Sequence, residues 1–260
     1  MIEPGLAAIA ALDAMREAIR PGISTLELDA IAESAIREAG GAPNFMLEPG
    51  YRHTICANVN ADVVHSIPND RPLEPGDIVS LDVGAVIGGW HSDTAITVAL
   101  PDPARPSVTE ANQRLSDVTE QAMWHGIARL ARAQHVNEIG EAVEGYVRKH
   151  SKFNVLEDYI GHGIGRSMHE DPQVFNVPVS RRGPDVKPGL VVAIEPIISA
   201  GTIDTVVQND DWTVTIADGS MSSQWEHSVA VHEEGIWVLT AADGGAAGLA
   251  PLGITPVPIP

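Results

Sequence analysis

The residues L-E-P-G-D-I-V-S-L-D at positions 73–82 have a close counterpart in V-K-P-G-L-V-V-A-I-E at positions 186–195. Each stretch contains a Pro-Gly pair, continues as an apolar run and ends on an acid six residues after the glycine. A Pro-Gly pair is typical of a turn, and a short apolar run after a turn indicates a buried strand. Both stretches therefore predict a turn and then a strand that ends on an acid, so that Asp82 corresponds to Glu195.

The similarity between the two regions extends to both sides of these strands, as in an internal repeat. Upstream, a helical pattern and a histidine loop occur in the same order, at residues 26–37 and 65–68 in the first region and at 137–148 and 162–165 in the second. Downstream, a tryptophan and an acid follow each strand, Trp90 with Asp93 and Trp225 with Glu226. Four matches in one order make chance a poor explanation.

This repeat predicts an α+β fold in which two related halves pack into one domain, with the matched acids near a pseudo-twofold axis. We expect a single catalytic domain over residues 1–240, with halves at approximately 1–105 and 106–240 and a loop at 101–107. The last residues, 241–260, are rich in Ala, Gly and Pro. They predict an irregular tail or a strap on the surface.

Composition limits the possible functions. The chain has 260 residues, 44% of them hydrophobic and 20% charged, which is ample for a globular core. Its formal net charge of -19 disfavours binding to nucleic acid or an anionic membrane and favours cations. A single cysteine, Cys56, allows no internal disulfide. Without a basic leader or an apolar run approaching ~18 residues, we expect a cytoplasmic protein.

The acids of the repeat stand in unusual surroundings. Asp82 and Glu195 each end an apolar strand, and the glycines at 88 and 89 predict a turn that returns Asp93 beside Asp82. Any one of these acids alone could face solvent or form a structural ion pair. Basic partners are scarce in these segments, however, and close carboxylates repel each other unless a proton or cation lies between them.

The stretch I-G-H-G-I-G-R-S-M-H-E-D at 160–171 adds two histidines in a glycine-rich context. A surface turn is the simplest interpretation of a lone G-H-G tripeptide. Glycine also allows close backbone approach, so the pattern favours His162 being presented to a ligand. Four acids and an imidazole suit a carboxylate-bridged pair of divalent metals, with Mn, Fe, Co or Zn as candidates. Paired metals of this kind polarise carbonyls in aminopeptidases.

The combined motifs resemble those of type I methionine aminopeptidases, from about residue 21 to about residue 239. The resemblance rests on V-V-H-S-I-P-N-D, S-L-D-V-G-A-V-I-G-G-W-H-S-D-T-A, Y-I-G-H-G-I-G-R-S-M-H-E-D-P, V-V-A-I-E-P and Q-W-E-H-S-V. It implies the pita-bread fold, two pseudo-symmetric halves around a dinuclear metal site. The metal ligands that it implies are Asp82, Asp93, His162, Glu195 and Glu226.

The same resemblance implies the roles of these residues. Asp93 and Glu226 would bridge two divalent metals, and His162 would bind one. Glu195 would also shuttle the proton of the bridging hydroxide that attacks the scissile carbonyl. His65 and His169 would hold the peptide and stabilise the tetrahedral intermediate. The substrate would be the initiator methionine of nascent chains near the ribosome, followed by a small second residue. Separately from the resemblance, a monomer is expected by default, because no exposed apolar patch can be inferred from the sequence.

The resemblance places the methionine pocket at Phe45, Tyr51, Cys56, Met168 and Trp212. Glu48 stands where the family has an aromatic residue. This departure concerns the substrate preference rather than the catalytic chemistry. The gap from Glu195 to Glu226 is too short for the helical insertion of type II enzymes, and no zinc-finger extension precedes the domain, so a bacterial type is expected. The expected helix before residue 21 is shorter than the corresponding helix usually is in this family.

Two other classes of protein are compatible with parts of this pattern. An X-Pro dipeptidase or creatinase-like enzyme has the same fold but normally carries an N-terminal domain for which this chain has no room. A non-catalytic binding protein on the fold would have lost ligands, whereas all five ligand positions and both outer histidines are filled here.

Overall fold

The repeated helical patterns form helices because each carries a buried apolar stripe. In the computed structural model, which describes residues 1–259, α2 (Thr25–Glu38) begins with a capping box between Ser24 and Glu27. It buries Leu28, Ala32 and Ile36. Its counterpart α4 (Glu138–His150) buries residues with the same spacing, Ile139, Val143 and Val147. Both helices predicted from the repeat are therefore confirmed. Pro260, in the predicted tail, lies outside the described residues.

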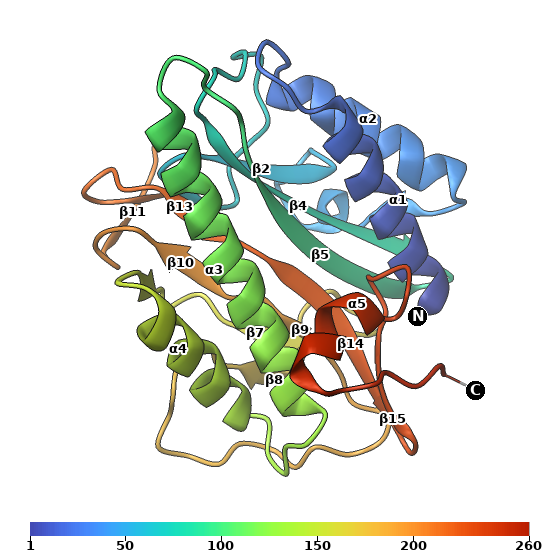
Figure 1. The fold of residues 1–260 in the computed structure, drawn as a ribbon. Coiled ribbons are helices and arrows are strands. Elements are labelled where there is room, and N and C mark those ends of the chain that lie inside the picture. Colours follow the sequence, from blue (N-terminus) through green and yellow to red (C-terminus); the bar gives the residue numbers. More distant parts are fainter. Residues whose placement is uncertain (260) are drawn as a thin grey trace.

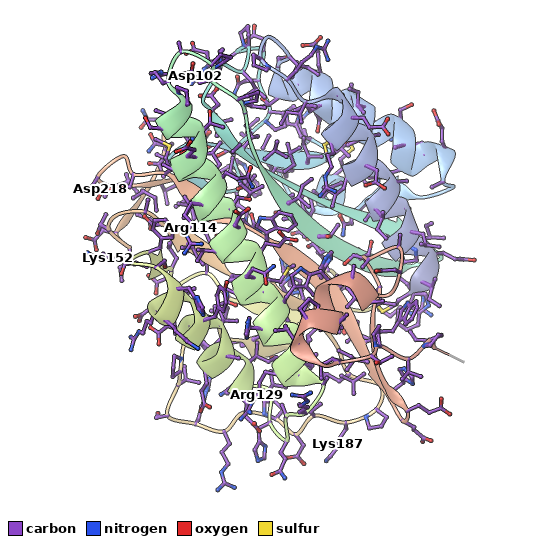
Figure 2. The ribbon with its side chains drawn as sticks, viewed as in Figure 1. Asp102, Arg114, Arg129, Lys152, Lys187 and Asp218 are labelled. Carbon is purple, nitrogen blue, oxygen red and sulfur yellow. The ribbon has the colours of Figure 1, made fainter. Side chains whose placement is uncertain are left out.

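Two further long helices complete the helical layer. They are α1 (Ile2–Ala18) and α3 (Pro106–Leu130), which the repeat does not predict. The loop predicted at 101–107 ends two residues inside α3, because proline is compatible with the first turn of a helix. Figure 1 shows α1 and α3 lying across one face of a curved sheet. Figure 2 shows side chains filling the space between the layers, with charged residues such as Asp102 and Lys187 at the periphery.

A nine-stranded sheet forms the centre of the molecule. Its main path has the order β1-β4-β5-β14-β9-β7-β8, with β2 paired to β4 and β15 paired to β14. The strands are β1 (Ala42–Pro43), β2 (Ile55–Val59), β4 (Ile78–Ile87), β5 (Trp90–Ala99), β7 (Gly161–Gly163), β8 (Glu170–Val174), β9 (Val191–Ile194), β14 (Glu226–His232) and β15 (Gly235–Val238).

Two small sheets and several short helices surround the central sheet. One sheet has the order β13-β10-β6 and the other β11-β12-β3. Their strands are β3 (Asp62–Val64), β6 (Asn154–Val155), β10 (Ile197–Ser199), β11 (Thr205–Val207), β12 (Val214–Ile216) and β13 (Ser222–Gln224). The short helices are η1 (Phe45–Leu47), α5 (Ala246–Leu249) and η2 (Ala250–Leu252). Among residues 1–259, no helix combines the length and the apolar character needed to cross a membrane.

The hydrophobic core has two main parts, one in each half. The first packs α1 and α2 against β2, β4 and β5, and the second packs α3 and α4 against β9, β14 and β15. Beyond residue 240 the chain lies against the second part, where Leu249 is fully buried and Val257 donates a backbone hydrogen bond to Ile236.

The β4–β5 hairpin confirms the predicted turn. Gly88 and Gly89 have φ values of 58° and 74° and connect the paired residues Ile87 and Trp90. Two consecutive positive φ values are strained for other residues and match the twist of a tight hairpin. Asp93 pairs with Gly84, two residues from Asp82, so both acids lie on the same face of the hairpin.

The glycines around His162 serve close packing of strands rather than an unusual backbone angle. A Cβ atom at Gly161 would collide with the carbonyl oxygen of Ala193, and one at Gly163 with that of Asp171. Neither glycine has a positive φ. The G-H-G sequence therefore lets β7 fit tightly between its neighbours β8 and β9, and His162 is fixed between them.

We expect Gly161→Ala to destabilise the protein by about 1–3 kcal/mol, because the added methyl group overpacks a rigid backbone. Denaturant unfolding followed by circular dichroism measures the change. Gly145→Ala is the matched control, because its Cβ would meet nothing within 4 Å on the exposed side of α4. That control should gain ~0.5–1 kcal/mol from better helix propensity. Equal stabilities for the two variants would contradict the packing argument.

Candidate active site

The five predicted metal ligands lie on five strands that are neighbours in the central sheet. The strand order β4-β5-β14-β9-β7 carries, in the same order, Asp82, Asp93, Glu226, Glu195 and His162. Glu195 directly follows the last residue of β9. The structure thus brings together residues that are as far apart as positions 82 and 226.

Pairing between β5 and β14 joins the two halves at these ligands. Glu226 pairs with Ala95, and the hydroxyl of Thr94 donates a 2.8 Å hydrogen bond to the Glu226 carbonyl oxygen. Ser228 Oγ accepts from the Asp93 backbone N–H at 3.1 Å and donates to the Asp93 carbonyl oxygen at 2.8 Å. These buried bonds fix the backbones of Asp93 and Glu226 relative to each other.

The side chains converge on a small volume. One ligand atom each of Asp93, His162 and Glu226 lies within 4.8 Å of the other two. His162 Nε2 is 3.4 Å from Glu195 Oε1. Asp93 and Glu226 are 4% and 2% exposed, so little water reaches their carboxylates. This arrangement is close enough for one or more shared cations.

Burial raises the pKa values of all four acids, and repulsion between the carboxylates adds to this effect for three of them. Burial raises the pKa of Asp82 to about 7. Burial and then the charge of neighbouring acids raise the pKa of Asp93, Glu195 and Glu226 well above the usual range. Without a cation, these groups therefore resist ionising together.

The residues fit divalent metal ions. Asp82 Oδ1 and Glu226 Oε1 are buried oxygens without a hydrogen-bond partner among residues 1–259. The cavity that they face is lined by five acids, the four candidate ligands and Glu48, and within residues 1–259 by no lysine or arginine. Oxygen donors with one imidazole suit first-row divalent metals, which would satisfy both unpartnered oxygens.

His162 is oriented for ligation by its own neighbour. Its Nδ1 lies 2.9 Å from the Gly163 carbonyl oxygen, which can only accept a hydrogen bond. The proton therefore resides on Nδ1, and the lone pair of Nε2 faces Glu195. Burial lowers the pKa of His162 to about 4, so the imidazole is neutral at physiological pH, as a metal ligand must be.

His65 and His169 lie where two cavities meet. Both line a cavity of about 270 Å³ that contains the acids and a neighbouring one of about 550 Å³. The ring of His169 lies 4.4 Å from that of His162, centroid to centroid. His65 has a φ of 60°, in a region that is costly for residues other than glycine and is often found at functional sites. Burial lowers the pKa of both imidazoles.

The residues predicted for the methionine pocket form one apolar cluster at the end of the smaller cavity. Phe45, Tyr51, Cys56 and Met168 are buried together, with Trp212 packed against them. The rings of Tyr51 and Trp212 meet edge to face at 5.0 Å. Glu48 also lines this cavity, and its charge opposes the effect of burial on the pKa of His169.

The structure adds two residues that the sequence analysis did not single out. Gln224 lines the smaller cavity and is 1% exposed. The signal in the sequence that could have identified Gln224 is its position two residues before Glu226. The side-chain amide of Asn176 donates to the carbonyl oxygens of Tyr159 and Glu195, each at 3.2 Å. It ties the backbone of Glu195 to the segment that precedes His162, a contact that no local motif indicates.

Comparison with known proteins agrees with this geometry. Residues 1–233 match the model of metallopeptidase family M24. Methionine aminopeptidase 1 of Mycobacterium tuberculosis is 44% identical, covering 92% of this chain and 91% of that protein. Methionine aminopeptidase 1 of Bacillus subtilis is 38% identical, covering 87% and 89%. The crystal structure of methionine aminopeptidase from Rickettsia prowazekii has a TM-score of 0.86 at 34% identity, covering 92% of this chain and 95% of that one.

The chain therefore belongs to metallopeptidase family M24 and, within it, to the methionine aminopeptidases. It is a hydrolase of the aminopeptidase class, and its α+β pita-bread fold confirms the fold expected from the sequence. The roles of the individual site residues remain predictions.

The raised pKa of Asp82 predicts how metal-free stability depends on pH. Because the folded protein binds a proton on Asp82 up to about pH 7 and the unfolded chain releases it near its ordinary pKa of 3.8, this group lowers the free energy of unfolding as pH rises through that window. We therefore expect metal-free Asp82→Asn to melt at a higher temperature than the metal-free parent above pH 7. The difference should disappear below pH 4.

Thermal unfolding in the presence of a chelator measures this difference. Adding a divalent metal should reverse the order of the two proteins at pH 7.5, because only the parent keeps all its carboxylate ligands. A parent that is more stable than the variant without metal, at every pH, would contradict the interpretation.

Proposed function

We propose that the protein removes the initiator methionine from the amino terminus of newly made chains by metal-dependent hydrolysis of the first peptide bond. The observation that carries this proposal is the convergence of four acids and His162, from four adjacent strands and the residue that follows a fifth, beside a cavity that ends in an apolar cluster. The names of the similar proteins support the same activity.

Two divalent metal ions, which Asp82, Asp93, His162, Glu195 and Glu226 would hold, would supply a Lewis acid for the scissile carbonyl and lower the pKa of the attacking water. Glu195 lines both cavities and lies beside His162. We assign its carboxylate the role of taking a proton from water and passing it to the nitrogen of the leaving amine.

His65 and His169 are proposed to bind the reacting peptide. Both imidazoles lie at the junction of the cavities, where the scissile bond has to lie if the methionine side chain occupies the smaller one. A ring N–H from either residue can donate to the oxygen of the carbonyl as negative charge develops on it. Both rings line this junction, and we propose that they limit the size of the second residue.

The methionine side chain is proposed to pack among Phe45, Tyr51, Cys56, Met168 and Trp212. Sulfur and aromatic side chains contact a thioether favourably. The buried hydroxyl of Tyr51 donates to the Ile55 carbonyl oxygen at 2.7 Å and so leaves the apolar ring to face the cavity.

Several broader expectations are part of the same proposal. All proposed ligands come from one chain, which supports an active monomer. We further propose a catalytic domain at 1–240, with halves at 1–105 and 106–240 that the two parts of the core support, and a following tail that packs against the second part. The cellular setting is proposed to be the cytoplasm, on chains emerging near the ribosome, and the metal to be Co, Mn, Fe or Zn.

The test is release of methionine from the peptide Met-Ala-Ser by metal-stripped protein titrated with Mn, Co, Fe or Zn. Glu195→Gln should lower kcat by about 10²- to 10⁴-fold, because it removes the group that moves the proton. Calorimetric titration with the same metals should show that the variant still binds metal. Metal-dependent activity that is unchanged in the variant would remove Glu195 from the mechanism, and no release with any metal would refute the proposed function.

For His169→Ala we expect a fall in kcat of about 10²-fold, with a smaller change in KM, because its hydrogen bond strengthens as charge develops on the carbonyl oxygen. His150→Ala is the control, since His150 lies on the exposed end of α4. Its steady-state kinetics should match the parent. A change confined to KM in His169→Ala would show that the residue binds the ground state and transition state equally.

A further inference from the structure

The larger cavity is the continuation of the candidate active site. It has a volume of about 550 Å³ and shares Val64, His65, His169 and Glu195 with the smaller one. At the inner end of this passage lie the unpartnered oxygens of Asp82 and Glu226, where the reacting end of a ligand belongs. If the proposed function holds, the methionine fills the smaller cavity and the peptide beyond the scissile bond must leave through the larger one.

Acidic side chains predominate on the walls of this exit groove, although Arg181 donates a 3.0 Å hydrogen bond to Gln173 on one wall. Asp158, Glu170 and Asp171 line it and are exposed, and within residues 1–259 no lysine or arginine does so. Glu48 lines the smaller cavity and acts on His169, which places it near the junction. The cations labelled in Figure 2, Arg114, Arg129, Lys152 and Lys187, lie at the outer surface.

These acids are not all equally free to meet a substrate. Glu170 Oε1 accepts a 2.7 Å hydrogen bond from the Ser167 backbone N–H and so helps to hold the loop before His169. Asp158, Asp171 and Glu48 take part in none of the ion pairs of the described chain. Their negative charge is therefore available to a peptide in the groove.

We propose that this acid-lined exit groove selects substrates with lysine or arginine at the third to fifth positions and disfavours acidic residues there. An extended chain advances about 3.3 Å per residue, so these positions fall within about 10 Å of the second residue and reach the groove walls. Opposite charges at exposed sites attract weakly, and salt screens them over about 8 Å at physiological ionic strength. The selection rests on the proposed aminopeptidase function and concerns which amino termini are processed fastest.

The experiment compares the amidated peptides Met-Ala-Ser-X-X with X as lysine, glutamine or glutamate. We expect kcat/KM for the lysine peptide to exceed that for the glutamate peptide by about tenfold at low salt, as a pair of exposed charge interactions would give. The ratio should fall towards one in 0.5 M salt. The double variant Asp158→Asn/Asp171→Asn should lower the lysine-to-glutamate ratio of kcat/KM to about twofold at low salt while retaining cleavage of the glutamine peptide. The single variant Glu48→Gln tests the contribution of the acid near the junction of the two cavities.

A matched control keeps the change of net charge constant. Glu233→Gln/Glu234→Gln neutralises two exposed acids that line neither cavity and should leave the lysine-to-glutamate ratio at the parent value. Equal kcat/KM for the three peptides in the parent, or an equal loss of preference in the control, would overturn the groove assignment while the aminopeptidase function stands. Failure to cleave even Met-Ala-Ser with any metal would overturn the proposed function and this inference together.

Discussion

The main constraint on the structure is that it places four carboxylates close together in buried positions at the centre of one sheet. Burial makes the ionised form of each acid costly, and the charge of neighbouring acids adds to that cost for Asp93, Glu195 and Glu226. A divalent cation reverses both effects, because it neutralises the charge and gives the unpartnered oxygens of Asp82 and Glu226 a partner. A site whose carboxylates are unfavourable without a cation therefore fits divalent metal ions.

Holding such groups together requires a rigid frame, and the sheet provides it. Each ligand belongs to a different strand, and adjacent strands fix the spacing between ligands through backbone hydrogen bonds. Where the two halves meet, Ser228 and Thr94 add side-chain bonds to the backbones of Asp93 and Glu226. The absence of a side chain at Gly161 and Gly163 lets β7 approach its neighbours, so that His162 lies within reach of Glu195.

Much of this arrangement is visible in local patterns. The spacing of Leu28, Ala32 and Ile36 is enough to predict α2, and the paired glycines at 88 and 89 predict the β4–β5 hairpin. The helix α3 has no counterpart in the repeat comparison, and its proline-rich beginning resembles a loop. The contact of Asn176 with Glu195 joins residues 19 apart through a backbone carbonyl, which leaves no trace in the side-chain pattern.

By itself, the sequence determined the secondary structure of the repeat, the identity of the acids and histidines, and through them the family. Those features depend on residue type and on the spacing of residues that are close together in the sequence, and both can be read from the sequence without a structure. Only the tertiary structure decided that the five strands are neighbours in the order β4-β5-β14-β9-β7 and that the two cavities join at His65 and His169. It also revealed the exposed acids along the exit groove. Strand order and the shape of a cavity depend on contacts between distant residues, because packing, rather than local propensity, selects which surfaces meet.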